Sequence, residues 1–251
     1  ERTVYNSGLF DFKTIHSMTA EKINTKIEIT WKAIEIYQKK GKVSIPDLVD
    51  ATKLSASEIY AHFPNKKSIL SFYYPALIYQ YWAMIEEIDD FEDYSLSEKF
   101  SNFIYTLFDM MSESPAFVDD TFDKHIFQKR SNSEFHKEVT VLFKDFLTSD
   151  GEIAVSAGFF MKDYFYKILA SQYLFLVRFW LSDESIDKER TLALSDKLTS
   201  LLQEAVYNKT IDKGFDLVKY LFSSVGIGKD IPFVGDCITD LFNQKEEKKD
   251  E

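Results

Sequence analysis

The stretch 44–70 contains three helix-start signals in close succession, and this spacing constrains the fold more than any other feature of the chain. Ser44 is followed three residues later by Asp47, and Ser55 is followed at the same distance by Glu58. A serine with an acidic residue three positions on fits the capping box, which satisfies free amides at the start of a helix. Two short helices are therefore expected here.

A third helix follows almost at once. Pro64 ends the second segment, and Asn65 can cap a helix that begins at Lys66 and continues to about Ile88. Between the caps, apolar residues recur at helical spacing and supply a small shared core: Ile45, Leu48, Val49, Leu54, Ile59 and Phe63. The pattern predicts a helix-turn-helix followed by a long connecting helix.

Residues 55–66, SASEIYAHFPNK, are similar to the recognition-helix signature of the TetR family of bacterial transcription regulators. In that family a serine opens the helix, a tyrosine and a His-Phe pair close it, and a lysine follows. The residues that carry the resemblance are Ser55, Tyr60, His62, Phe63 and Lys66, with Gly41 and Ser44 upstream. The resemblance covers roughly residues 22–72.

Four positions depart from the family pattern. The family usually has alanine where this chain has Val49 and Thr52, and glycine where it has Lys53 in the turn. A positive φ at Lys53 would cost about 1 kcal/mol. Glu58 has two interpretations, because its carboxylate can cap the helix or contact a cytosine amino group.

The resemblance implies that this region binds double-stranded operator DNA. Phosphate contacts set the register of a protein on DNA, whereas base contacts specify the sequence. The residues expected at the DNA are Ser44, Lys53, Ser55, Ala56, Ser57, Glu58, Tyr60, Lys66 and Lys67. Tyr60 has an alternative role as a half-buried brace, and His62 and Phe63 are interpreted as packing residues. A twofold dimer would address half-sites about one helical turn apart, or a multiple of it, on a roughly palindromic operator.

The composition favours an all-α protein. The chain has 251 residues, 45% of them hydrophobic, with only eight glycines and five prolines, so a large helical core is expected. The expected organisation is an extension at 1–18, a helix-turn-helix domain at 19–70, a helical effector-binding and dimerisation domain at 71–226, and an extension with a charged tail at 227–251.

The net charge of −11 is unevenly distributed. Residues 1–75 hold 11 Lys and Arg against 8 Asp and Glu, whereas the remainder holds 19 against 33. A local positive surface is enough for phosphate contact, and an acidic body discourages non-specific coating of DNA. The asymmetry is therefore compatible with a DNA-binding amino-terminal region.

Other function classes lack support in the sequence. The single Cys237 excludes an internal disulfide framework, and the four histidines have no metal-ligand spacing, so neither a metal nor a cofactor is expected. No nucleophile elbow, phosphate loop or dinucleotide fingerprint indicates an enzyme. The most apolar run, 169–181, is interrupted by Ser171, Gln172 and Arg178, so no membrane span or secretion signal is expected, and a cytoplasmic location follows.

Apolar periodicity predicts helices along the rest of the chain. The expected ranges are 20–40, 95–111, 118–128, 133–147, 153–181, 185–207 and 211–223, with a further segment at 231–242. In the TetR family the corresponding late helices pair across a twofold axis. The resemblance therefore implies a homodimer formed through the helices within 153–207.

The aromatic residues of the body have two interpretations. They can form a large helical core, or some of them can line a concave apolar pocket for a small hydrophobic effector. The pocket candidates are Phe103, Phe108, Met111, Phe122, Phe127, Phe143 and Tyr166.

The leading hypothesis is a TetR-like repressor released by such an effector. The alternative is a TetR-like helical protein that carries a lipid or another hydrophobic ligand without binding DNA. A positive surface around the second and third helices would favour DNA.

Overall fold

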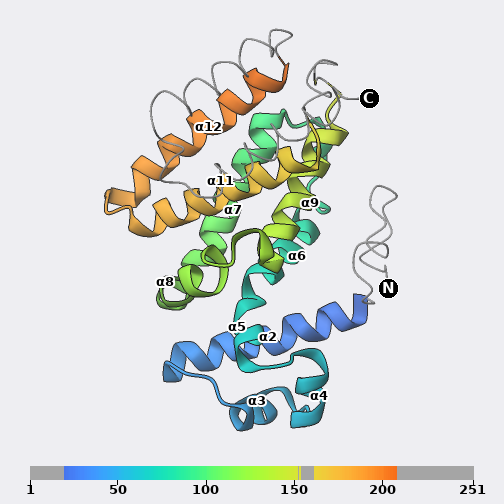
Figure 1. Ribbon diagram of the computed structural model, residues 1–251, viewed down its shortest axis with the longest axis vertical. Helices are drawn as coiled ribbons and strands as arrows, with labels where there is room; N and C mark the ends of the chain where they lie inside the picture. Colours follow the sequence, from blue (N-terminus) through green and yellow to red (C-terminus); the bar gives the residue numbers. More distant parts are fainter. Residues whose placement is uncertain (1–19, 152, 154–160, 208–251) are drawn as a thin grey trace, which may run out of the picture.

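The computed structural model describes residues 20–151, 153 and 161–207, and within these ranges the secondary structure is helical with no strand (Figure 1). This confirms the all-α class. The α-helices are α2 (Ala20–Lys40), α3 (Ile45–Thr52), α4 (Ala56–His62), α5 (Lys66–Ser71), α6 (Tyr73–Ile85), α7 (Leu96–Ser112), α8 (Pro115–Phe122), α9 (Glu134–Ser149), α11 (Asp163–Ser182) and α12 (Glu189–Tyr207). The short elements are the 3-10 helices η1 (Phe91–Asp93), η3 (Arg130–Asn132) and η4 (Ile186–Lys188) and the π-helix η2 (Asp123–Phe127).

Some expectations fall on other parts of the chain. The expected extensions at 1–18 and 227–251, the helix at 211–223, the segment at 231–242 and Cys237 lie outside the described residues.

Helices α2 to α5 form a small unit, here called the head, at the lower end of the molecule in Figure 1. The long helix α2 packs against α3, α4 and α5, as its apolar periodicity predicts. Its predicted bounds are confirmed, and Gly41 ends it with φ +67°, a conformation that glycine adopts without steric cost. The core of the head extends into α6 and consists of Ile23, Ile29, Ala33, Leu48, Ile59, Phe63, Ile69, Phe72, Ala76 and Tyr79.

The single helix predicted from Lys66 to about Ile88 is wrong. The chain forms α5 and then α6, with Phe72 between them, and α6 ends at Ile85. Pro75 explains the break, because proline has no amide hydrogen to donate to the carbonyl four residues earlier and its ring collides with that carbonyl. The helical connection from head to body is therefore interrupted at Phe72.

The remaining helices, α6 to α12, form the body, in which α9 packs against α6 and α11, and α7 packs against α6 and α12. The body has its own aromatic core, in which Phe103 contacts both Phe143 and Tyr173 at ring-centroid distances of 5.3 and 4.8 Å. Trp31 and Leu70 are partly buried against both cores. Head and body are therefore joined by continuous apolar packing.

Two predicted helices of the body begin elsewhere. The helix expected at 118–128 begins at Pro115, which suits the first turn because its missing amide hydrogen would have no partner there, and it continues as the π-helix η2. Within the range expected as a helix at 153–181, α11 begins at Asp163, and Lys162 before it is extended. Residues 154–160 of that range lie outside the described residues.

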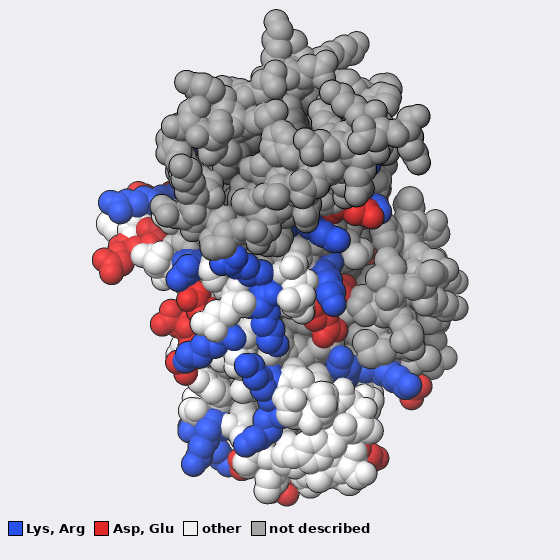
Figure 2. Space-filling model, in the orientation of Figure 1, with Lys and Arg blue, Asp and Glu red and all other residues white. Residues whose placement is uncertain are grey.

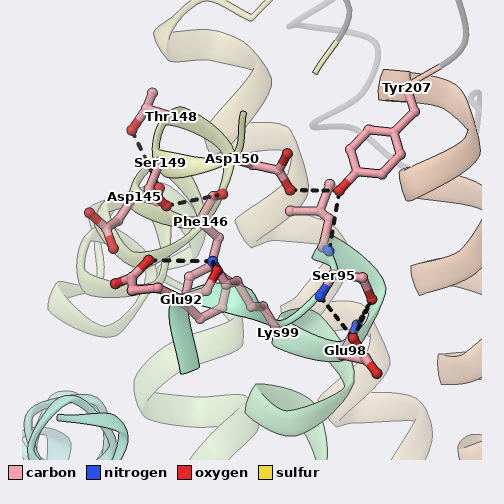
Figure 3. A network of polar contacts seen from close by, with 11 residues as sticks. Glu92, Ser95, Glu98, Lys99, Asp145, Phe146, Thr148, Ser149, Asp150 and Tyr207 are labelled. Carbon is pink, nitrogen blue, oxygen red and sulfur yellow. Dashed lines mark hydrogen bonds and ion pairs between the residues drawn. The ribbon is translucent and has the colours of Figure 1, made fainter. Parts of the chain in front are cut away.

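Polar contacts fix the carboxyl-terminal end of α12 to the body (Figure 3). The hydroxyl of Tyr207 donates to Asp150 at 2.6 Å and accepts from the backbone N–H of Leu96 at 3.4 Å. Beside it, Ser95 and Glu98 form the capping box that starts α7. One tyrosine thus joins the end of α12 to the start of α7 and the end of α9.

The same region holds a buried cation between carboxylates (Figure 3). Lys99, which is 2% exposed, donates from Nζ to the Glu92 carbonyl at 3.0 Å and lies 3.5 Å from the Glu92 carboxylate. Burial, together with repulsion from Glu92, raises the pKa of Asp145 to about 6, although Lys99 opposes the shift. Folding therefore makes the Asp145 carboxyl group easier to protonate than that of an exposed aspartate.

Helix α12 buries three hydroxyl-bearing side chains and exposes two of its leucines. Thr191, Ser195 and Thr199 are buried, whereas Leu198 and Leu201 are 43% and 62% exposed. No helix in the described ranges has the length and apolar character needed to cross a bilayer.

Candidate nucleic-acid interface

The turn between α3 and α4 adopts the geometry that the sequence predicts. The Ser44 side chain caps α3 by accepting from the Asp47 N–H at 3.3 Å. Lys53 ends α3 with φ +62° and ψ 10°, and its N–H donates to the Val49 carbonyl at 3.0 Å. Lys53 therefore occupies the left-handed conformation that favours glycine, which places its exposed side chain between the two helices.

A complete capping box starts α4. The N–H of Glu58 donates to Ser55 Oγ at 3.2 Å, and the N–H of Ser55 donates to the Glu58 carboxylate at 2.7 Å. These hydrogen bonds hold the pKa of Glu58 below its usual range. The capping interpretation of Glu58 is confirmed.

The two faces of α4 have opposite character. Ile59 and Phe63 are 0% and 2% exposed and pack into the head. Ala56, Ser57, Tyr60 and Ala61 face solvent, and Tyr60 is 49% exposed. The helix therefore presents a strip of small side chains beside one tyrosine hydroxyl. Phe63 is a packing residue, as predicted, and His62 is half-buried.

The start of α5 brings two more lysines close to α4. Asn65 caps α5 by accepting from the Ser68 N–H at 2.9 Å, and the Ser68 hydroxyl accepts from the Asn65 N–H at 3.3 Å. The next residues, Lys66 and Lys67, are exposed. Because Pro64 and Asn65 make the connection short, these lysines lie near the carboxyl-terminal end of α4.

Exposed lysines border the small-residue strip, and few carboxylates oppose them. Within the described residues, Lys53, Lys66 and Lys67 have no ion-pair partner, whereas Lys40 pairs with Asp47. Figure 2 shows a largely uncharged surface at the lower end of the molecule with Lys and Arg beside it. Exposed lysines therefore stand near both ends of α4, beside its small side chains.

A buried lysine that the sequence analysis did not single out connects this interface to the body. Lys26 of α2 is 9% exposed, and its Nζ lies 4.0 Å from the ring centre of Phe72 and 5.2 Å from that of Phe63. It also lies 3.9 Å from Glu134 Oε1, and burial lowers its pKa. The available signal was its spacing, since Lys26 follows Ile23 by three residues on the apolar face of α2.

The seven predicted effector residues are all buried, but they do not form one group. Phe103 and Phe143 pack together at 5.3 Å, Phe108 stacks on Trp180 at 4.9 Å, and Phe122 contacts Phe127 at 6.5 Å. Met111 and Tyr166 also belong to the body core. Phe127 differs from the other six because it lines an open cleft at the surface.

Comparison with known families adds independent information on the body. Residues 99–221 match the family model described as tetracyclin repressor-like, C-terminal domain. No curated protein matches the chain. The matched region begins in α7 and follows the head, so the body of the matched family and the helix-turn-helix arrangement occur in one chain. The chain therefore belongs to the TetR family.

Proposed function

We propose that this TetR-family regulator is a homodimeric repressor that binds a roughly palindromic operator through α4 and is released by a small effector. The observation that carries the proposal is the strip of Ala56, Ser57 and Tyr60 on α4, which is exposed while Ile59 on the opposite face is fully buried. A helix with small exposed side chains can approach base edges in the major groove.

Each residue of the interface has a role that its position supports. Ala56 and Ser57 lie in the first turn of α4, where they would meet base edges. Ser44, Lys53, Tyr60, Lys66 and Lys67 would contact phosphates. Ser55 and Glu58 would act mainly by holding the first turn of α4 in place, because their polar groups are already engaged with each other.

The proposed homodimer would use α11 and α12. Phe179 and Ile186 are 41% and 79% exposed, as are the outward leucines Leu198 and Leu201 at 43% and 62%. Exposed apolar side chains that cluster on adjacent helices are typical of a protein interface. A second copy of this chain would bury them and place two heads side by side for the two half-sites.

Coupling between effector and DNA requires that the two ligands prefer different arrangements of head and body. The interruption at Phe72 is one place where the head can change its angle. Lys26 contacts the Phe72 ring, the end of α4 through Phe63, and the start of α9 through Glu134. A shift of α9 would therefore reach the recognition helix through this lysine.

The proposal is tested by fluorescence-anisotropy titration of the full chain against duplexes upstream of its own gene and against a selected duplex library. We expect saturable binding whose log affinity falls with log salt by about 0.9 for each phosphate contact. Tyr60→Ala and Lys66→Ala should weaken binding across sequences, whereas Lys137→Ala at an exposed position of α9 should not. Absence of saturable, salt-sensitive binding would exclude the regulator and favour the carrier of hydrophobic ligands.

A further inference from the structure

A cleft of about 490 Å³ lies on the surface of the body where η2 and η3 approach Arg178 of α11. Its lining includes Asp123, Phe127, Lys129, Arg130, Asn132 and Arg178. The volume lies within the range of small-molecule sites. The cleft is separate from the DNA-facing strip of α4, because its lining residues all belong to the body.

Cations dominate the cleft. Lys129, Arg130 and Arg178 face one carboxylate, that of Asp123, and Arg178 Nε already lies 3.3 Å from Asp123 Oδ1. Arg178 is also held over the Phe127 ring, with its Cζ 4.6 Å from the ring centre. The pair of Asp123 and Arg178 is therefore close to neutral, and among the described residues no carboxylate forms an ion pair with Lys129 or Arg130.

Arg130 has the features of a residue positioned for a ligand. It is half-buried, and its guanidinium has no hydrogen-bond or ion-pair partner among the described residues. Its backbone has φ +46°, which is unfavourable for a residue other than glycine. A guanidinium offers five donors, and an anionic acceptor can satisfy two of them at once.

An apolar recess adjoins the cations. Phe127 and Arg130 also line a narrow pocket with Leu174 and Phe175, which leads toward α11. The rings of Phe127 and Phe175 meet edge to face with centroids 5.0 Å apart. The cleft thus combines a cationic rim with an aromatic wall.

We propose that this cleft binds an amphipathic anion, with a carboxylate or phosphate group at Arg130 and Lys129 and an apolar portion against Phe127. The inference deepens the proposed function by naming the chemical class of the effector. Only its consequence for DNA affinity rests on that function, since binding to the cleft requires no DNA.

The cleft is connected to the head by packing and by charge. The π-helix η2 contacts α5. Burial lowers the pKa of His125 in η2, and the positive charges of Lys67, Lys129 and Lys124 lower it further, so these lysines face one another across the boundary. An anion at Lys129 reduces the positive potential that Lys129 and Lys67 share around His125. It therefore alters the position of α5, which begins with the proposed phosphate contacts Lys66 and Lys67.

Isothermal titration calorimetry on the full chain tests the ligand class. The probes are decanoate, decyl phosphate, decanol and inorganic phosphate. The two amphipathic anions are used below their micelle-forming concentrations. We expect the two amphipathic anions to bind at least about tenfold more tightly than decanol or phosphate. The tighter of the two identifies the head group. Equal affinity for decanol would overturn the role of the cations, and equal affinity for inorganic phosphate would overturn the role of the apolar wall.

Arg130→Gly tests the location without threatening the fold, because glycine adopts the observed positive φ readily. We expect the affinity for decanoate to fall at least about tenfold while the thermal midpoint is retained. Arg178→Gln should weaken binding as well. Lys162→Gln, at the opposite end of α11, removes an exposed charge and should change nothing. Unchanged affinity in both arginine variants would refute the site.

A DNA titration separates the two proposals. Saturating decanoate should change operator affinity in the wild type but not in Arg130→Gly. If the protein binds decanoate and no DNA, the anion site is supported and the proposed regulatory function is refuted. If it binds DNA while calorimetry detects no anion binding, the regulatory function is supported and the anion site is refuted.

Discussion

The head and α12 differ in the exposure of their apolar side chains. In the head, Ile59 and Phe63 point inward and are 0% and 2% exposed. In α12 the buried positions are Thr191, Ser195, Thr199 and Val206, while Leu198 and Leu201 are 43% and 62% exposed. Both segments show helical periodicity in the sequence. The helix α12 contributes Leu194, Leu202 and Val206 to the body core, but it leaves two further leucines exposed.

The difference follows from what surrounds each helix. The short helix α4 packs against α2 and α3, so its apolar side chains can be buried between these helices. The helix α12 packs mainly on α7, in part through hydroxyl contacts such as Ser97 with Thr199 at 3.3 Å and Ser101 with Thr199 at 3.2 Å. Beside this contact, Leu198 and Leu201 remain exposed. Periodicity therefore identifies an apolar stripe but does not identify its partner.

The largest expected effect is in the head. Ile59→Ala should lower the free energy of unfolding by about 2–5 kcal/mol, because it opens a cavity in a small core. DNA binding should be lost with it. Leu201→Ala, measured in dilute monomeric protein, should change the same quantity by no more than about 0.5 kcal/mol. Chemical denaturation measures the free energy of unfolding of both variants. Similar losses in the two would contradict the expected difference between the head and α12.

The second largest expected effect is on the proposed dimer and not on the folding of the monomer. Leu198→Glu combined with Leu201→Glu should leave the monomer folded but weaken the proposed dimer at least about 100-fold, because two apolar contacts are replaced by charges. Sedimentation velocity measures the change. Ser200→Glu is the matched control, since it adds a charge to an exposed position of α12 outside the leucine stripe. A double variant that still forms dimers would show that another surface mediates association.

Two carboxyl groups, Asp145 in α9 of the body and Asp47 in the head, should affect stability with opposite dependence on pH. The folded state raises the pKa of Asp145 to about 6, so the stability that its protonation contributes is present below about pH 4 and lost as pH rises through 6. Asp145→Asn should therefore be more stable than wild type at pH 7.5, by about 1 kcal/mol after allowance for solvent screening. The gap should narrow as pH falls below 6 and close at about pH 4.

Asp47 in the head provides the comparison for Asp145. Hydrogen bonds from Lys40 and Ser44 lower its pKa, so its contribution is present at neutral pH and lost as pH falls through the lowered value. Asp47→Asn should accordingly be less stable than wild type at pH 7.5. Parallel thermal melts from pH 4 to 7.5 measure both gaps, and gaps of the same sign would contradict this account of the two carboxyl groups.

The sequence predicted the head better than the body because the head is specified by local contacts. Capping at Ser44, Ser55 and Asn65 involves residues only three positions apart, and each cap forms as expected. The cleft depends instead on contacts between distant segments, since Arg178 meets Phe127 from another helix. No spacing along the chain encodes that meeting. Phe127 was predicted at an effector site, but Arg130 and Arg178 were not.

Lys53 is where local strain and proposed function can be separated. Its φ of +62° is unfavourable for lysine, so Lys53→Gly should raise the free energy of unfolding by up to about 1 kcal/mol. The same change removes a proposed phosphate contact, and the salt dependence of DNA binding should fall by about 0.9 in slope. Lys53→Asn separates the terms further, since asparagine also tolerates the left-handed conformation and carries no charge. If both variants gained stability and kept the full salt slope, Lys53 would be a turn residue alone, and the phosphate contacts beside α4 would fall to Lys66 and Lys67.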